Sequence, residues 1–201
     1  MIAIVDYGAG NIFSVKNALD YLGLDSKLTD SADEIRAADE VILPGVGAFP
    51  AAMKMLESKG LIPVLKTEAQ KKPLLGICLG MQMLLEKSYE FEECSGLGLI
   101  PGTVERIDAP GLIIPHMGWN KLEMGIPCPL LAHLPEESYV YFVHSYAAKN
   151  CDRSLAAWVE YGGRVPAMVY DGGNVFGAQF HPEKSGEVGL QILRNFGALK
   201  G

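Results

Sequence analysis

The chain has 201 residues, of which 49% are hydrophobic and 20% are charged, a balance typical of a compact globular protein with a substantial core. The 24 acidic residues outnumber the 17 Lys and Arg, and the resulting net charge of −7 argues against a nucleic-acid partner. The longest uncharged stretches have 13 residues, too few to span a bilayer of about 30 Å, so no membrane association is expected.

Charge and cysteine spacing also bear on location and metal binding. Asp6 interrupts the apolar N-terminus, so no signal peptide is expected and a cytoplasmic location is predicted. The four cysteines, Cys78, Cys94, Cys128 and Cys151, contain no C-x-x-C pair. We therefore predict neither a zinc site nor a disulfide framework, and we expect no metal and no cofactor.

Short runs of Ile, Val and Leu alternate with helical patterns through the first hundred residues. The runs at 2–5, 41–43 and 74–77 predict buried parallel strands. Helices are expected from the N-cap Asn11 to a stop at Gly23, and over 49–58, about 61–71 and 79 to about 87. This alternation predicts a doubly wound α/β sheet.

The second half reads as antiparallel strands followed by a helix. Strand patterns occur at 139–146, 155–161, 167–170 and 175–180. A hairpin turn is predicted at Asp171–Asn174, and the strands either extend the sheet or form a smaller one. A closing helix from about Ser185 carries Val188, Ile192, Phe196 and Leu199 on one face. Without a linker or repeat, residues 1–201 are expected to form one three-layer α/β domain.

Glycine-rich turns follow the three predicted parallel strands, at 6–11, 44–47 and 76–80. Ligands bind at the carboxyl edge of open α/β sheets, so one site is predicted there. Gly8-Ala9-Gly10 does not continue into G-x-G-x-x-G, because residue 13 is Phe, which excludes a dinucleotide site. This turn is either a simple βα connection or a support for the 44–47 loop or for a partner.

The turn Gly76-Ile77-Cys78-Leu79-Gly80 has the G-x-C-x-G pattern of a nucleophile elbow with cysteine in place of serine. A helix N-terminus at Cys78 favours the attacking thiolate, and the N–H of Leu79 is placed to stabilise an oxyanion. A buried cysteine on a strand-to-helix bend is the alternative.

The segment His181-Pro182-Glu183 favours the catalytic alternative. Pro182 favours an extended conformation at His181, in which His181 and Glu183 project to the same side and can touch. A carboxylate that orients an imidazole, which in turn activates a cysteine, is the logic of a catalytic triad. A structural histidine and a solvated glutamate are the alternative.

Several motifs together resemble a known family. Pro44-Gly45-Val46-Gly47, Gly76–Gln82 and Phe180-His181-Pro182-Glu183 resemble those of the class I glutamine amidotransferases, which implies their flavodoxin-like fold. Val46 replaces the second glycine of most members. Three further segments narrow the resemblance: Pro115–Asn120, Tyr141–Tyr146 and Lys184-Ser185, which continues the His181 motif. With them, the chain is similar to the glutaminase subunits of imidazole glycerol phosphate synthase in histidine biosynthesis.

The resemblance implies roles for individual residues. Cys78, His181 and Glu183 correspond to the triad, and the N–H groups of Leu79 and Val46 to the oxyanion hole. Gly47, Gln82, Glu90, Ser145 and Tyr146 correspond to glutamine-binding positions. Asn11, Trp119, Tyr141 and Lys184 correspond to positions that face a separate synthase (cyclase) subunit in a heterodimer.

The reaction this implies is hydrolysis of glutamine through a Cys78 thioester, with His181 protonating the departing ammonia. The cyclase partner would use the ammonia to make imidazole glycerol phosphate and an aminoimidazole carboxamide ribotide. Gly45 and Gly47 flank Val46, so a loaded partner is expected to switch the Val46 peptide between inactive and active orientations. Three alternatives stay open: a glutaminase for another synthase such as that of the pyridoxal phosphate pathway, a stand-alone cysteine hydrolase, and a non-catalytic binding module.

Overall fold

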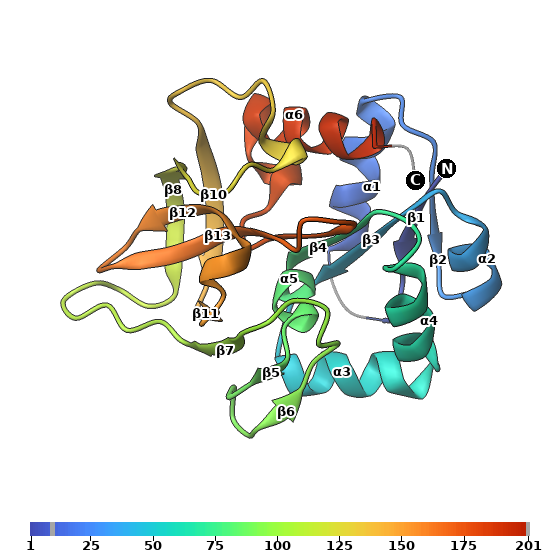
Figure 1. Cartoon of the computed structure of the whole chain (residues 1–201), viewed down its shortest axis with the longest axis horizontal. Coiled ribbons are helices and arrows are strands. Elements are labelled where there is room, and N and C mark those ends of the chain that lie inside the picture. Colours follow the sequence, from blue (N-terminus) through green and yellow to red (C-terminus); the bar gives the residue numbers. More distant parts are fainter. Residues whose placement is uncertain (9–10, 200–201) are drawn as a thin grey trace.

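A computed structural model describes residues 1–8 and 11–199, and its central feature is an eight-stranded mixed sheet (Figure 1). Its strands are β1 (Ile2–Val5), β2 (Ser26–Thr29), β3 (Glu40–Gly45), β4 (Leu74–Cys78), β9 (Glu123–Met124), β12 (Leu155–Glu160), β13 (Arg164–Tyr170) and β14 (Val175–Ala178). They lie in the order β2-β1-β3-β4-β14-β13-β12-β9, parallel from β2 to β14 and antiparallel beyond. The predicted α/β class and the antiparallel extension are confirmed.

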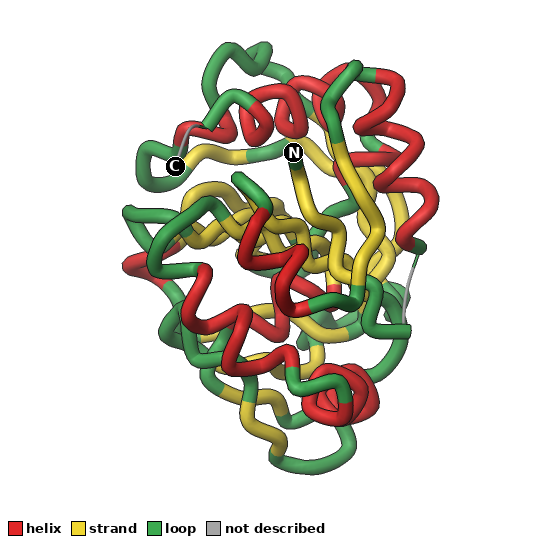
Figure 2. The backbone as a smooth tube through the Cα atoms, turned by 90° about the vertical axis from the view of Figure 1, so that its right-hand side faces the viewer, coloured by secondary structure: helices red, strands yellow, loops and turns green. Residues whose placement is uncertain are grey.

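Helices cover both faces of this sheet (Figure 2). They are α1 (Ile12–Tyr21), α2 (Ala32–Ala37), α3 (Phe49–Ser58), α4 (Leu61–Glu68), α5 (Leu79–Leu84) and α6 (Gly186–Gly197), with 3-10 turns η1 (Pro129–Leu131), η2 (Asp152–Ser154) and η3 (Pro182–Lys184). One apolar core joins the sheet to α1 and α6, and a second joins it to α2 through α5. Strand β1 alternates between them: Ile2 and Ile4 enter the first core, Ala3 and Val5 the second.

Two smaller sheets complete the fold. A ribbon pairs β8 (His116–Lys121) with β10 (Tyr139–His144), and a four-stranded sheet joins β5 (Lys87–Ser88), β6 (Cys94–Ser95), β7 (Thr103–Arg106) and β11 (Tyr146–Lys149). The single strand predicted over 139–146 is therefore wrong, because the chain changes sheets at Ser145. Burial alternates along β10 as far as His144 and loses its alternation at Ser145. The sequence 139–143 is apolar throughout, so its pattern does not reveal the change of partner.

Helix boundaries depend on contacts that the sequence pattern does not contain. Helix α3 has the predicted bounds, but α4 ends at Glu68 rather than Lys71 and α5 at Leu84 rather than Lys87. The carbonyl oxygens of Leu84 and Leu85 accept hydrogen bonds from the N–H groups of residues 98–100 instead of continuing the helix. Strand β14 likewise ends at Ala178 rather than Phe180, where the chain begins its approach to η3.

The first βα connection and the short elements after it were less well predicted. Asn11 occupies the N-cap position of α1, but its side chain does not cap the helix: its Oδ1 accepts a hydrogen bond from Ser14 Oγ at 2.6 Å. Strand β2 and the six-residue helix α2 were not predicted. Ala9 and Gly10 of the first glycine-rich turn lie outside the described residues. Within the described residues, no helix combines the length and apolar character needed to cross a bilayer.

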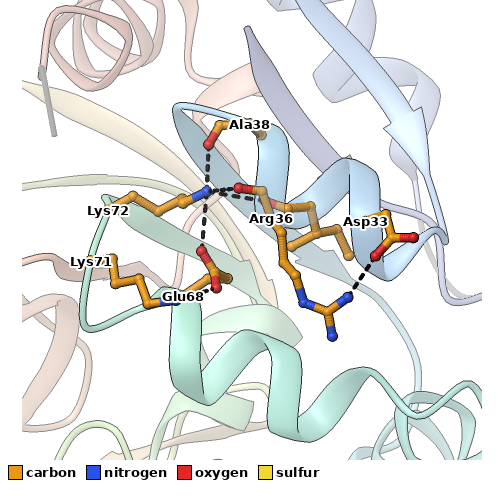
Figure 3. Close-up of polar contacts among 7 residues, drawn as sticks. Asp33, Arg36, Ala38, Glu68, Lys71 and Lys72 are labelled. Atoms are coloured by element: carbon orange, nitrogen blue, oxygen red, sulfur yellow. Dashed lines mark hydrogen bonds and ion pairs between the residues drawn. The ribbon is translucent and has the colours of Figure 1, made fainter.

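Lys72 connects α2 to α4 from a buried position (Figure 3). Its Nζ donates to the carbonyl oxygens of Ile35, Arg36 and Ala38, at 3.3, 2.7 and 2.5 Å, and pairs with Glu68 Oε2 at 3.2 Å. The last carbonyl oxygens of a helix accept no hydrogen bond from an N–H group of the same helix. Lys72 therefore caps the C-terminal end of α2 and holds it against α4.

Candidate active site

Cys78 lies at the sharp turn between β4 and α5, with φ 55° and ψ −111°. A positive φ is rare for a side chain with a Cβ, and such strain concentrates at functional sites. The turn requires glycine on both sides. A Cβ at Gly76 would lie 2.6 Å from the backbone of Gly80, and one at Gly80 would lie 1.8 Å from the carbonyl oxygen of Leu43. The local geometry of a nucleophile elbow is thus present.

His181 and Glu183 form a buried pair. Nδ1 of His181 lies 2.8 Å from Oε1 of Glu183, and the two side chains are 3% and 1% exposed. The predicted contact is correct, but it does not arise from an extended segment. His181 itself is extended, whereas Pro182–Lys184 forms η3, and this turn folds the carboxylate back onto the ring.

The second nitrogen of His181 is the one available to a ligand. Nε2 is buried and has no hydrogen-bond partner among the described residues. Burial lowers the pKa of His181, but charge attraction from Cys78 and the hydrogen bond and charge of Glu183 outweigh burial and raise this pKa to about 9. The ring is consequently an imidazolium at neutral pH, with an N–H directed away from Glu183.

A pocket of about 310 Å³ opens over Cys78, at the carboxyl ends of β3 and β4. Its lining comprises Val46, Gly47, Cys78, Leu79, Gln82, Glu90, Val143, His144, Ser145, Tyr146 and His181. Nine of these were singled out from the sequence as triad, oxyanion or substrate-binding positions. Glu183 lies behind His181, and Val143 and His144 were not predicted.

The loop at Val46 adjoins the elbow because Gly45 pairs with Cys78 across β3 and β4. Gly47 has φ +100°, and a Cβ there would meet nothing within 4 Å, so glycine is favoured here by backbone conformation and not by packing. Gly45 is different. A Cβ at Gly45 would lie 2.7 Å from the Tyr7 hydroxyl, so this glycine is needed for close packing. The sequence alone predicts conformational freedom at both Gly45 and Gly47. Close packing removes this freedom at Gly45 and leaves only Gly47 unconstrained by neighbouring atoms.

Two buried side chains hold the ends of this loop. Tyr7 donates to the carbonyl oxygen of Pro44 at 3.0 Å, and Glu90 Oε2 accepts from the N–H of Phe49 at 2.8 Å. Glu90 thereby caps α3, for which Ala48 at the N-cap offers no side-chain acceptor. The segment 46–48 is thus fixed at both ends and open in the middle. Tyr7 belongs to the glycine-rich turn at 6–11. Its hydrogen bond to Pro44 agrees with the prediction that this turn supports the 44–47 loop.

Gln82 and Gln179 form an amide network beside the thiol. Gln82 Nε2 donates to the carbonyl oxygen of Tyr146 at 2.9 Å and to Gln179 Oε1 at 3.0 Å, while Gln179 Nε2 donates to Cys78 Sγ at 3.8 Å. Both Gln82 amide hydrogens are used, so Oε1 is left to accept from a ligand. Gln179 is fully buried and was missed from the sequence. A polar residue inside the apolar run 175–180 was the available signal.

Two of the four residues predicted to face a partner lie on or directly beside η3, Lys184 on η3 itself and Tyr141 on β10, and Trp119 pairs with Tyr141. Trp119 and Tyr141 are opposite each other on β8 and β10, with ring centroids 5.9 Å apart, and Trp119 is 54% exposed. Lys184 is exposed on η3, which contacts both β10 and α1, and Asn11 is the N-cap residue that precedes α1. Met117 and Tyr139, on the same face of the ribbon, are also exposed and were not predicted.

A cysteine on a strained strand-to-helix turn of an α/β sheet, faced by a histidine–glutamate pair, defines the class of thiol-dependent enzymes that act on acyl compounds. Residues 3–198 match the family model described as glutamine amidotransferase class-I. The chain belongs to the class I glutamine amidotransferase family.

Curated relatives and solved structures agree with this assignment. The chain is 54% identical over 197 residues to imidazole glycerol phosphate synthase subunit HisH of Bacillus cereus (strain G9842), covering 98% of this chain and 93% of that protein. It is 52% identical over 198 residues to the HisH subunit of Listeria monocytogenes serotype 4a (strain HCC23), covering 98% and 94%. A crystal structure of a glutamine amidotransferase has the same fold, with a TM-score of 0.76 at 21% identity over 98% of this chain and 99% of that one.

Proposed function

We propose that this chain hydrolyses glutamine to glutamate and ammonia and delivers the ammonia to a separate cyclase subunit of imidazole glycerol phosphate synthase in histidine biosynthesis. The observation that carries the proposal is the 54% identity to HisH subunits along 98% of the chain. The pocket supports it, because Cys78 and His181 line it, and Glu183 is hydrogen bonded to His181 from behind, which is the combination that amide hydrolysis needs.

The first half of the reaction forms a thioester. The Cys78 thiolate attacks the side-chain carbonyl carbon of glutamine, and the N–H groups of Leu79 and Val46 stabilise the resulting oxyanion. His181 Nε2–H then protonates the amide nitrogen as the C–N bond breaks, because an unprotonated amide nitrogen is a very poor leaving group. The raised pKa of His181, about 9, suits this acid role.

The second half releases glutamate. Neutral His181 removes a proton from water, the hydroxide attacks the thioester carbon, and the C–S bond breaks to return the thiolate and the imidazolium. Gln179 contributes a hydrogen bond to the sulfur at 3.8 Å in the resting site. Glu183 holds the His181 ring with Nε2 toward the sulfur and stabilises its positive charge.

The proposal assigns the exposed surface around η3 to the cyclase partner, in a heterodimer. Tyr141 and Lys184 adjoin the triad segment, since the Tyr141 carbonyl accepts from the His181 N–H and Lys184 is the residue after Glu183. Trp119 is paired with Tyr141, and Asn11 precedes α1, which contacts η3. A partner bound there would act on the Val46–Ala48 loop and switch the oxyanion N–H into place. The proposal takes residues 1–201 as one domain, and a cytosolic location, in keeping with the four free cysteines.

The test combines the protein with the cyclase subunit and measures glutamate release with and without the cyclase substrate. Restoring a missing oxyanion donor changes rates by about 10²–10³-fold, which sets the expected minimum stimulation. Cys78→Ala should lose glutamine-dependent turnover, while added ammonia should still support the cyclase reaction. Steady hydrolysis of glutamine, esters or peptides without any partner would instead favour a stand-alone hydrolase. Failure of a glutamine-analogue alkylator to label Cys78 would favour a binding module.

A further inference from the structure

A chain of polar groups runs from β8 to the wall of the pocket. Asn120 Oδ1 lies 2.8 Å from Nε2 of His116, and Nδ1 of His116 lies 3.0 Å from Nε2 of His144. Nδ1 of His144 lies 2.8 Å from the carbonyl oxygen of Tyr146. The proposed reaction uses neither histidine.

Both imidazoles are buried, which is costly for polar rings unless they are hydrogen bonded. His116 is 0% exposed and stacks between Phe142 and Tyr161, with ring centroids 4.8 and 3.9 Å away. His144 is 7% exposed. Burial lowers the pKa of both rings, that of His144 to about 4, so both are neutral at pH 7.

Neutral rings fix where the hydrogens lie. A carbonyl oxygen only accepts, so Nδ1 of His144 carries a hydrogen and Nε2 of His144 is an acceptor. His116 must then donate from Nδ1 and accept at Nε2. The Asn120 amide completes this arrangement after a half-turn that brings its nitrogen, in place of Oδ1, toward His116 and gives up the 3.4 Å hydrogen bond from Nδ2 to the exposed Glu160 carbonyl oxygen. Every N–H in the chain then points toward the pocket.

The chain ends at an atom that also orients Gln82. The Tyr146 carbonyl oxygen accepts from His144 Nδ1 at 2.8 Å and from Gln82 Nε2 at 2.9 Å. Movement of this carbonyl would release one of the two contacts that hold the Gln82 amide, the other being Gln179. His144 thus affects which atom Gln82 presents to a ligand. It does so indirectly, because both ring nitrogens of His144 are already hydrogen bonded, to His116 and to the Tyr146 carbonyl.

We propose that His144 and His116 are positioning residues of the substrate pocket, which hold the Tyr146 carbonyl, and through it Gln82, in the orientation that binds glutamine. The identity of the ligand rests on the proposed function. Because neither ring touches the reacting atoms, their loss should weaken saturation by glutamine or its analogues and leave the intrinsic reactivity of the thiol unchanged.

Two substitutions at one position separate positioning from packing. In His144→Asn the amide nitrogen takes the place of Nδ1 and can still donate to the Tyr146 carbonyl. In His144→Gln the amide takes the place of Nε2 and can reach only His116. The readouts, made on the complex with the cyclase subunit and its substrate, are labelling of Cys78 by a diazoketone analogue of glutamine and, as control, by iodoacetamide, which needs no glutamine contacts.

We expect His144→Gln to raise the half-saturating concentration of the analogue about tenfold, the effect of one lost hydrogen bond, and His144→Asn to raise it less than about threefold. Iodoacetamide should label all three proteins at the same rate. Equal half-saturation in the two variants, or a matching loss of iodoacetamide labelling, would overturn the inference. A wild-type protein that the analogue does not label saturably would count against the proposed function instead.

The wild-type protein offers a second readout that needs no variant to fold. Nitrogen NMR of the histidine rings should find His144 with its hydrogen on Nδ1, the less common form of a free imidazole. His144 protonated on Nε2 alone would leave the Tyr146 carbonyl without this donor and would refute the inference.

Discussion

The hydroxyl of Ser185 clamps the backbone of His181. Oγ of Ser185 donates to the carbonyl oxygen of His181 at 2.6 Å and accepts from the N–H of Tyr141 at 3.0 Å. The N–H of His181 in turn donates to the carbonyl oxygen of Tyr141 at 3.0 Å. Tyr141 is paired with exposed Trp119, so the proposed partner surface is connected to the histidine through two backbone hydrogen-bonding groups of one residue.

Ser185→Ala should therefore lower kcat for glutamine hydrolysis in the complex, by about tenfold, with little change in KM. The substitution leaves the Tyr141 N–H and the His181 carbonyl without their shared partner, which loosens the ring that transfers the proton. Glutamate release measured against glutamine concentration separates the two constants. Ser58→Ala, on the exposed face of α3, is the matched control. Identical kcat in the two variants would show that the clamp has no influence on the reaction.

The pH dependence should report the His181 imidazolium. Its pKa is raised to about 9 from the ordinary histidine value of 6.5, so glutamine hydrolysis should fall as pH rises through about 9. Glu183→Gln removes one of the groups that raise this pKa, so the decline should begin at lower pH. Its control is Glu187→Gln, an exposed position on α6. If the fall in hydrolysis at high pH were the same in Glu183→Gln as in the wild type, this fall would not be due to the His181–Glu183 pair.

Stability should follow the same group. Because the folded-state pKa lies above the unfolded one, the stabilisation is complete below about pH 6.5 and is lost as pH rises toward 9. Thermal unfolding of the wild type should weaken over this range, and Glu183→Gln should show a flatter dependence. A wild-type melting temperature that rises between these pH values would contradict the sign of the linkage.

Gly47→Ala should impair the oxyanion loop through backbone conformation alone. Gly47 has φ +100° with open space around it, so alanine meets no clash but disfavours this conformation by about 1–2 kcal/mol. Loss of the loop N–H should reduce stimulated hydrolysis by about 10²-fold. Gly172→Ala, at φ +87° in the 171–174 hairpin turn and equally free of neighbours, carries the same backbone strain away from the pocket. Equal activity in both variants would argue against a switching loop at Gly47.

Lys72 and Lys71 provide a matched pair for stability. Both contact Glu68, but Lys72 is buried and also holds three carbonyl oxygens, whereas the Lys71 side chain is 59% exposed. Lys72→Met should lower the free energy of unfolding by about 3 kcal/mol, because the end of α2 loses its capping cation and the buried Glu68 carboxylate keeps only the exposed Lys71. Lys71→Met should cost at most about 1 kcal/mol. Urea denaturation of the two variants tests the difference, and similar midpoints would contradict it.

Local rules account for what the sequence by itself determined. The bounds of α3 follow from its apolar spacing and Pro50, and the Asp171–Asn174 turn from its composition. The elbow at Cys78 and the contact between His181 and Glu183 are equally local, since they depend on neighbouring glycines and on residues two apart. The adjacent ends of β3 and β4 at the pocket follow from the rule that parallel strands direct their carboxyl ends to one edge.

Only the tertiary structure decided which polar groups meet across the pocket. Tyr7 and Pro44 are 37 residues apart, Phe49 and Glu90 are 41 apart, and Gln179 and Cys78 are 101 apart. The chain from Asn120 to Tyr146 likewise depends on the pairing of β8 with β10, which places His116 opposite His144. Such contacts depend on strand register and on the change of sheet at Ser145, and a shift of one residue would turn each side chain to the opposite face. Periodicity along the chain carries no information about that register.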